Sequence, residues 1–242
     1  METAGVVQGQ ESAFPKAEYE ARQAGARARL AKAGLDALVI TGPENIFYLT
    51  GQQTPGYYTF QALILPAEGD PVFVIRQLEY FNFIANTFIP DAEVYQDAED
   101  PIAALMRVLD RMGLKGRRVA IDKRGWFLPI AVYETMLDAL GAIEDGAGIV
   151  EAGRAVKSPA EVEKLRKAAS YVDAGMTAGL AAVKAGATDN DLVAAMLQAS
   201  IAAGSEYMGM EQLVSTAHRT GIPHGTWRRK PLSSNDPAFL EM

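Results

Sequence analysis

The residues best suited to chemistry lie near the end of the chain, and the first of them is a histidine. His224 stands between Pro223 and Gly225, which favour a tight turn with close access to the backbone. A neutral imidazole accepts or donates a proton near pH 7, as general acid–base catalysis requires. A lone histidine in a loop is also a common surface or core residue, so the residues alone leave both interpretations open. His218, the second histidine, is interpreted as a polar residue that ends a strand.

Three cationic side chains follow His224 closely. Arg228, Arg229 and Lys230 come directly after Trp227. Guanidinium groups bind carboxylates through two hydrogen bonds, so this segment is a candidate clamp for the carboxylate of a substrate. A solvated loop has the same composition, and the sequence favours neither the clamp nor the loop.

The composition indicates which class of protein carries these residues. Of 242 residues, 49% are hydrophobic and 22% are charged, which are globular proportions. The net charge of -7 argues against a surface that binds nucleic acid or anionic lipid. Cysteine is absent, which excludes disulfides and a thiol nucleophile. Residues 1–14 lack the pattern of a signal peptide, and no apolar run is long enough to span a membrane. We therefore expect a cytoplasmic protein.

Helical and strand patterns alternate up to about residue 150. Helices are predicted at 16–33, 77–86, 100–113 and 130–140, and strands at 36–41, 62–65, 71–75 and 118–121. The loop at 67–70 joins two of the strands as a hairpin. This alternation predicts an α/β domain over residues 16–152, after a disordered start at 1–15.

A second domain is predicted over residues 153–242. Ser158, Pro159 and Glu161 combine a capping box with a proline at the first helical position. An apolar stripe from Val162 to Val183 continues that helix. Thr188 can cap a second helix that ends before residue 204, and strands are expected at 212–216 and 238–241. Two helices and two strands make a thin domain, so we expect it to be truncated.

Four segments, in the right order, resemble the creatinase/aminopeptidase P family. Residues 45–51 (NIFYLTG) fit its Asn-x-x-Tyr-Leu-Thr-Gly pattern, and 154–169 resemble its inter-domain junction, where Lys157 and Arg166 would be structural. Residues 222–226 (IPHGT) resemble its His-Gly segment, and 235–241 resemble the strand that carries its first metal-binding carboxylate. The resemblance implies a ribonuclease H-like α/β domain, with a mixed sheet and flanking helices, followed by an incomplete α+β pita-bread catalytic domain.

Members of this family hydrolyse C–N bonds in Xaa-Pro peptides, in creatine, or in related small amides and cyclic amidines. Peptidase members use two divalent metal ions (Mn, Co or Zn) held by two Asp, one His and two Glu, whereas creatinase-like members work without metal. Glu241 stands where the first metal-binding Asp would stand, and its extra methylene displaces the carboxylate. The resemblance therefore leans to the metal-free branch, with no cofactor.

The resemblance also assigns roles to individual residues. His224 would be the general base and acid, and Glu241 would be a ligand equivalent, a binder of a substrate ammonium, or a plain strand-end carboxylate. The loop at 52–58 would be an ordinary turn or would bring Tyr57 or Tyr58 to the active site of a neighbouring subunit in a homodimer. The alternatives are a metal-dependent Xaa-Pro dipeptidase and a non-catalytic binding module.

Overall fold

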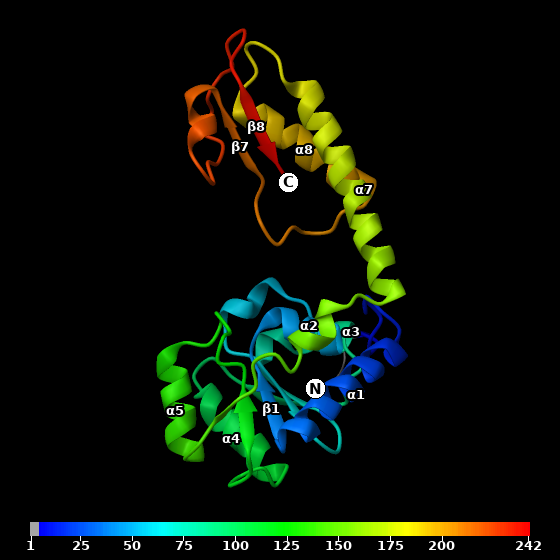
Figure 1. The fold of residues 1–242 in the computed structure, drawn as a ribbon, viewed down its shortest axis with the longest axis vertical. Coiled ribbons are helices and arrows are strands. Elements are labelled where there is room, and N and C mark those ends of the chain that lie inside the picture. Colours follow the sequence, from blue (N-terminus) through cyan, green and yellow to red (C-terminus); the bar gives the residue numbers. More distant parts are fainter. Residues whose placement is uncertain (1–4) are drawn as a thin grey trace. The chain divides into compact units, whose positions relative to one another are not determined.

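The computed structural model describes residues 5–242 and divides into two compact units (Figure 1). The N-terminal unit ends at Val156 and the C-terminal unit begins at Lys157. The inter-domain junction expected at 154–169 therefore contains this division. Each unit has its own hydrophobic core.

A six-stranded mixed sheet forms the centre of the N-terminal unit, in the order β4-β3-β2-β1-β5-β6. Strand β2 is antiparallel to both of its neighbours, and the other pairs are parallel. The predicted hairpin is present as β2 and β3. The strands are β1 (Ala37–Ile40), β2 (Ala62–Pro66), β3 (Val72–Arg76), β4 (Asp91–Tyr95), β5 (Val119–Ile121) and β6 (Glu144–Asp145).

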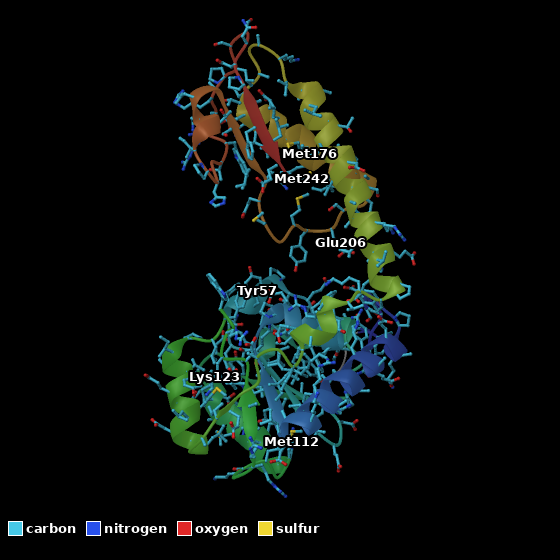
Figure 2. The ribbon with its side chains drawn as sticks, viewed as in Figure 1. Tyr57, Met112, Lys123, Met176, Glu206 and Met242 are labelled. Carbon is cyan, nitrogen blue, oxygen red and sulfur yellow. The ribbon has the colours of Figure 1, made fainter. Side chains whose placement is uncertain are left out.

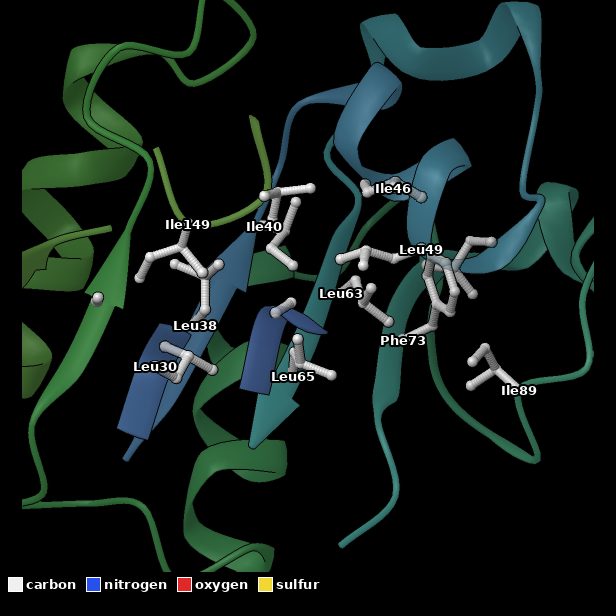
Figure 3. Close-up of a cluster of buried hydrophobic side chains, with 14 of the residues drawn as sticks. Leu30, Leu38, Ile40, Ile46, Leu49, Leu63, Leu65, Phe73, Ile89 and Ile149 are labelled. Atoms are coloured by element: carbon white, nitrogen blue, oxygen red, sulfur yellow. The ribbon is translucent and has the colours of Figure 1, made fainter. Parts of the chain in front are cut away.

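Helices cover both faces of this sheet. On one face, Leu38 and Ile40 of β1 join a core built with α1, α2 and α3 (Figure 3). On the other face, Ala37 and Val39 pack in a core with α4 and α5. Because both faces are covered, β1 is a continuous apolar run rather than an alternating one. The helices are α1 (Lys16–Ala33), α2 (Pro43–Thr50), α3 (Tyr80–Asn86), α4 (Pro101–Arg111), α5 (Ile130–Leu140) and α6 (Glu151–Ala155).

Several elements differ from the sequence prediction. Residues 43–50, where no helix was predicted, form helix α2, which begins with Pro43 and is capped by Gly51 at a φ of 87°. The helix expected from residue 77 begins at Tyr80, after a 3-10 turn at 77–79. Strand β4 was not predicted, because it lies at an edge of the sheet and is mostly polar or partly exposed.

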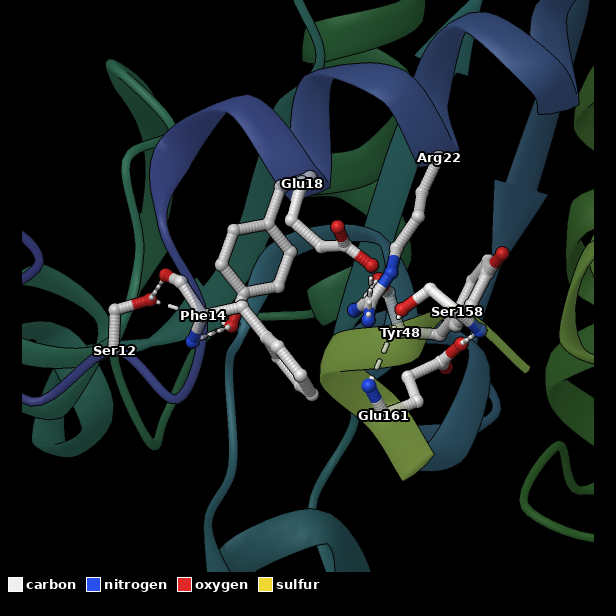
Figure 4. A network of polar contacts seen from close by, with 8 residues as sticks. Ser12, Phe14, Glu18, Arg22, Tyr48, Ser158 and Glu161 are labelled. Carbon is white, nitrogen blue, oxygen red and sulfur yellow. Dashed lines mark hydrogen bonds and ion pairs between the residues drawn. The ribbon is translucent and has the colours of Figure 1, made fainter. Parts of the chain in front are cut away.

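Residues 5–15, where a disordered start was expected, contact α3 through the main chain. The N–H of Gly9 donates to the carbonyl of Ile84 at 2.8 Å, and the N–H of Glu11 donates to that of Ala85 at 2.9 Å. Phe14 is buried, and the guanidinium of Arg22 lies 4.3 Å from the centre of its ring (Figure 4). This segment thus shares in the packing of the N-terminal unit.

The C-terminal unit packs two helices against a two-stranded antiparallel sheet. Its elements are α7 (Pro159–Ala182), α8 (Asp189–Ala203), β7 (Leu213–Thr216) and β8 (Ala238–Glu241). The predicted capping box of Ser158 and Glu161 is present (Figure 4), and Thr188 forms another with Asp191. Met176 and Met242 pack against the small core of this unit (Figure 2).

The apolar stripe of α7 is only partly used in packing. Leu165 and Leu180 are 56% and 62% exposed, whereas the buried residues of α7 are Gly175 and Gly179. A β-carbon at Gly179 would lie 2.5 Å from Cγ of Met196, so α8 packs closely onto a small-residue face. Within residues 5–242, Leu165 and Leu180 of the predicted apolar stripe are therefore not buried. No helix within residues 5–242 is both long and apolar enough to cross a membrane.

Candidate active site

His224 lies in a tight turn between the 3-10 helix η3 (Ala217–Gly221) and β8. Its side chain is exposed and its φ is +55°, in the left-handed region. The N–H of Gly225 donates to the carbonyl of Ile222 at 3.2 Å and closes the turn. The turn predicted from Pro223 and Gly225 is therefore present. A non-glycine residue held at positive φ is uncommon and costs free energy, so the surrounding contacts must hold His224 in place.

The segment that follows His224 is held by Asp189, the first residue of α8. This residue is completely buried, and its Oδ2 accepts hydrogen bonds from the N–H of Arg228 at 2.8 Å and from Nη1 of Arg219 at 3.2 Å. Its Oδ1 accepts from the N–H of Lys230 at 2.8 Å. The second guanidinium nitrogen of Arg219 donates to the carbonyl of Thr226 at 2.7 Å. The segment after His224 is therefore fixed to the first turn of α8 by a buried, fully paired carboxylate.

Sequence reasoning missed this role of Asp189. An acidic residue directly after the capping Thr188 is typical of a helix start and gives no reason to expect a partner 39 residues later. The available signal was a carboxylate in the helix start together with Arg219 in a polar loop. Neither residue type alone distinguishes a buried pair from two solvated charges.

The two arginines after His224 use their backbones for this attachment and leave their side chains exposed. Arg229 has a φ of +59°, and its N–H donates to Oδ1 of Asn190 at 2.8 Å. Within residues 5–242, neither Arg228 nor Arg229 forms a side-chain ion pair. Their guanidinium groups can therefore receive a carboxylate. Trp227 instead packs against the core of the unit.

Glu241 lies on the face of the two-stranded sheet that is turned away from the core. Leu240 packs in the core with its partner Val214, so the alternating Glu241 and Phe239 point to the opposite face. Ser215, opposite Phe239, is on that same face. A β-carbon at Gly225 would lie 3.6 Å from Cβ of Ser215, so the turn that contains His224 lies against Ser215 on this face.

Four of the predicted site residues, His224, Arg228, Arg229 and Glu241, belong to the C-terminal unit. His224 is next to Gly225 over Ser215, and Glu241 is about 7–8 Å diagonally from Ser215 by the usual spacing of a strand pair. Arg228 and Arg229 follow on the segment held by α8.

Tyr58 belongs to the N-terminal unit, in the 3-10 helix η1 (Pro55–Tyr58), where its side chain is 79% exposed. Its neighbour Tyr57 contacts Phe127 edge to face, with ring centres 5.4 Å apart.

The described residues do not supply the ligands of a dinuclear metal site. Nowhere in residues 5–242 do three or more His, Cys, Asp or Glu side chains come together in a way that could hold a metal ion. His224 and Glu241 offer one nitrogen and one carboxylate donor. A two-metal centre needs several bridging and terminal carboxylates, so these residues alone do not fit one.

Comparison with known families identifies the class of protein. Residues 22–156 match the creatinase/prolidase N-terminal domain, and residues 163–242 match the metallopeptidase family M24. The chain therefore belongs to the creatinase/prolidase family, as its motifs predicted, with the creatinase N-terminal domain followed by part of an M24 pita-bread domain.

Individual relatives agree with this assignment. The chain is 25% identical over 249 residues to ectoine hydrolase of Halomonas elongata, covering 95% of this chain and 62% of that protein. It is 28% identical over 209 residues to an uncharacterized peptidase of Staphylococcus saprophyticus, covering 86% and 57%. The chain thus spans about 60% of the length of these curated relatives.

Solved structures show the same fold. Dipeptidase PepE from Mycobacterium ulcerans superposes with a TM-score of 0.75 at 25% identity, covering 94% of this chain and 60% of that one. A prolidase from Thermococcus sibiricus superposes with a TM-score of 0.78 at 19% identity, covering 92% and 60%. The predicted fold class, a mixed α/β sheet domain followed by a pita-bread domain, is confirmed.

Proposed function

We propose that this chain is part of a hydrolase that cleaves a C–N bond in a small substrate, with His224 as the group that transfers the proton. The observation that carries this proposal is the turn that holds His224 exposed at positive φ, with its neighbour Gly225 against Ser215 on the sheet face that bears Glu241. The match of residues 163–242 to a hydrolase family supports it.

In this proposal a water molecule attacks the carbonyl or amidine carbon while the imidazole of His224 accepts its proton. The oxygen adds to carbon, the C–N bond breaks, and the proton passes from the imidazole to the leaving nitrogen. General acid–base catalysis of this kind contributes about 10²–10⁴-fold to the rate, and positioning of the substrate supplies much of the rest.

The neighbouring charges would orient the substrate. Arg228 or Arg229 would bind a carboxylate through paired N–H donors, and Glu241 would bind an ammonium or amidinium group. Such a site suits short peptides and small zwitterionic amides or cyclic amidines. We also propose a homodimer in which Tyr58 of a second copy reaches the substrate, because its side chain in η1 is exposed.

No step is assigned to a metal ion, since the described residues do not assemble its ligands. Glu241 in place of the aspartate expected in peptidase members supports the metal-free branch. The test is a turnover screen with the chain and any longer product of its gene, with and without Mn²⁺ or Co²⁺. We expect metal-independent turnover of ectoine, creatine or a related amide; turnover that needs added metal would contradict the metal-free proposal.

A second candidate is a metal-dependent Xaa-Pro dipeptidase. It is favoured by the match to a metallopeptidase family and by the 25% identity to a dipeptidase. The same screen separates it from the first candidate, because it predicts cleavage of Xaa-Pro dipeptides only with added metal. Absence of turnover by every form under all conditions would favour the non-catalytic binding module.

A further inference from the structure

A cavity of about 410 Å³ lies in the N-terminal unit, at the carboxyl ends of β1 and β5. Gly42 and Asn45 follow β1, Asp122 and Gly125 follow β5, and all four line the cavity. These two strands are parallel neighbours. In α/β sheets small ligands bind beyond the carboxyl ends of parallel strands, and this volume is within the range of small-molecule sites. The cavity belongs to a different unit from His224 and is not used by the proposed hydrolysis.

Hydrogen bonds hold one wall of the cavity in a defined arrangement. Oε1 of Glu151 accepts from Nδ2 of Asn45, and its Oε2 accepts from the N–H of Gly148 at 2.8 Å. Oδ1 of Asn45 in turn accepts from Nη1 of Arg154 at 2.8 Å. Burial opposes ionisation of Glu151, but these hydrogen bonds outweigh it and lower its pKa. Glu151 is therefore a fixed carboxylate whose charge is offset by Arg154.

Asp122 is the carboxyl group that this network leaves without a cation. Burial raises its pKa, and the adjacent Glu151 carboxylate raises it further. Within residues 5–242 neither Asp122 nor Glu44, which also lines the cavity, forms an ion pair. A cation bound here would relieve the repulsion between the Asp122 and Glu151 carboxyl groups.

The rim of the cavity carries an open aromatic surface. Trp126 is 95% exposed and Phe127 is 38% exposed, and both line the cavity. A tryptophan this exposed is unusual for a residue that usually buries most of its surface. The face of an indole attracts cations, most strongly where the site is shielded from water.

We propose that this cavity binds a small organic cation, with its charge beside Asp122 and Glu151 and its apolar groups against Trp126 and Phe127. An anion is the weaker candidate. Arg124 and the first turn of α2 would favour one, but Glu44 lies in that first turn and opposes it. Three carboxyl groups against two guanidinium groups also leave the lining acidic.

The test uses the whole chain with Trp227→Phe, which leaves Trp126 as the single tryptophan. Choline is the probe, and 3,3-dimethylbutan-1-ol is its neutral isostere. We expect a saturable change in Trp126 fluorescence with choline, weakened by salt, and none with the alcohol over the same concentrations. Equal responses to both compounds, or no saturable response to choline, would overturn the proposal.

Two variants locate the site. Asp122→Asn removes the charge with little change in shape, and we expect it to weaken choline binding about tenfold. Asp138→Asn changes an exposed aspartate on α5 of the same unit and should leave the affinity unchanged. Trp126→Leu, followed by calorimetry, should also weaken binding by severalfold. Unchanged affinity in both Asp122→Asn and Trp126→Leu, with folding verified by circular dichroism, would overturn the proposed location.

Discussion

A carboxylate oxygen of Asp189 lies 3.2 Å from the guanidinium of Arg219, and no part of Asp189 is exposed to solvent. The same carboxylate accepts the N–H groups of Arg228 and Lys230. One buried charge therefore ties the start of α8 to the segment that follows His224.

Asp189→Ala should destabilise the C-terminal unit by about 3–5 kcal/mol, because it leaves the largely buried guanidinium of Arg219 without a counter-charge. Urea unfolding in a Trp126→Phe background measures this, since Trp227 then reports on the C-terminal unit alone. Asp173→Asn, an exposed change on α7, is the matched control and should have little effect. A loss no greater in Asp189→Ala than in this control would show that the loop does not depend on Asp189.

Gly179→Ala should destabilise the C-terminal unit, although alanine is the better helix former. The new β-carbon would meet Cγ of Met196 at 2.5 Å and Cδ2 of Leu240 at 2.9 Å, and overpacking of this kind costs about 1–3 kcal/mol. Gly25→Ala in α1 is the comparison, because its nearest neighbour is the end of the Arg29 side chain at 3.6 Å. That change should stabilise the protein by up to about 1 kcal/mol. Thermal unfolding followed by circular dichroism distinguishes the two, and a gain of stability in Gly179→Ala would refute the close packing of α7 on α8.

Asp122→Asn should stabilise the N-terminal unit at pH 7 and have little effect in acid. Burial and the Glu151 carboxylate raise the pKa of Asp122 above its usual 3.8, so folding favours the protonated form. The stability that this group contributes is present below pH 3.8 and is lost as the pH rises through its folded pKa. Asparagine does not ionise, so the variant does not lose this stability as the pH rises. Urea unfolding of both proteins at pH 7 and near pH 4 is the measurement. A larger gain in the free energy of unfolding at pH 4 than at pH 7 would contradict a raised pKa for Asp122.

The N-terminal unit should be stable as a separate fragment, whereas the C-terminal unit should be marginal. The first covers both faces of a six-stranded sheet with helices, and the second has a two-stranded sheet and one small core. Limited proteolysis of the whole chain should leave residues 1–156 as the resistant product. A resistant fragment 157–242 with degradation of the first unit would contradict this.

Much of the fold could be predicted from the sequence where local signals agree with burial. The apolar strand ending at Ile40 and the capping box at Ser158 are examples, because both depend on residues close together in the chain. Helix α2 could not be recognised, since its eight residues are too few to show a clear helical period. The close packing at Gly175 and Gly179 of α7 could not be predicted either, because glycines carry no apolar signal although they allow the closest approach.

In the candidate site, too, features set by adjacent residues could be predicted and features set by distant residues could not. His224 and its turn could be predicted from three adjacent residues, whereas the attachment of its loop to Asp189 could not. That attachment joins residues about 40 positions apart, and one sequence contains no sign of such a pairing. The acidic cavity was also missed, because Asn45, Asp122 and Glu151 come together only when β1 and β5 lie side by side.

The most direct test of the central claim compares His224→Ala with His218→Ala in the form of the protein that turns over substrate. Both histidines are exposed and lie six residues apart, but only His224 is held in the turn over the sheet. We predict that His224→Ala lowers kcat/KM by about 10²-fold or more, whereas His218→Ala leaves it nearly unchanged. Equal effects of the two substitutions, or full activity of His224→Ala, would contradict the assignment of proton transfer to His224.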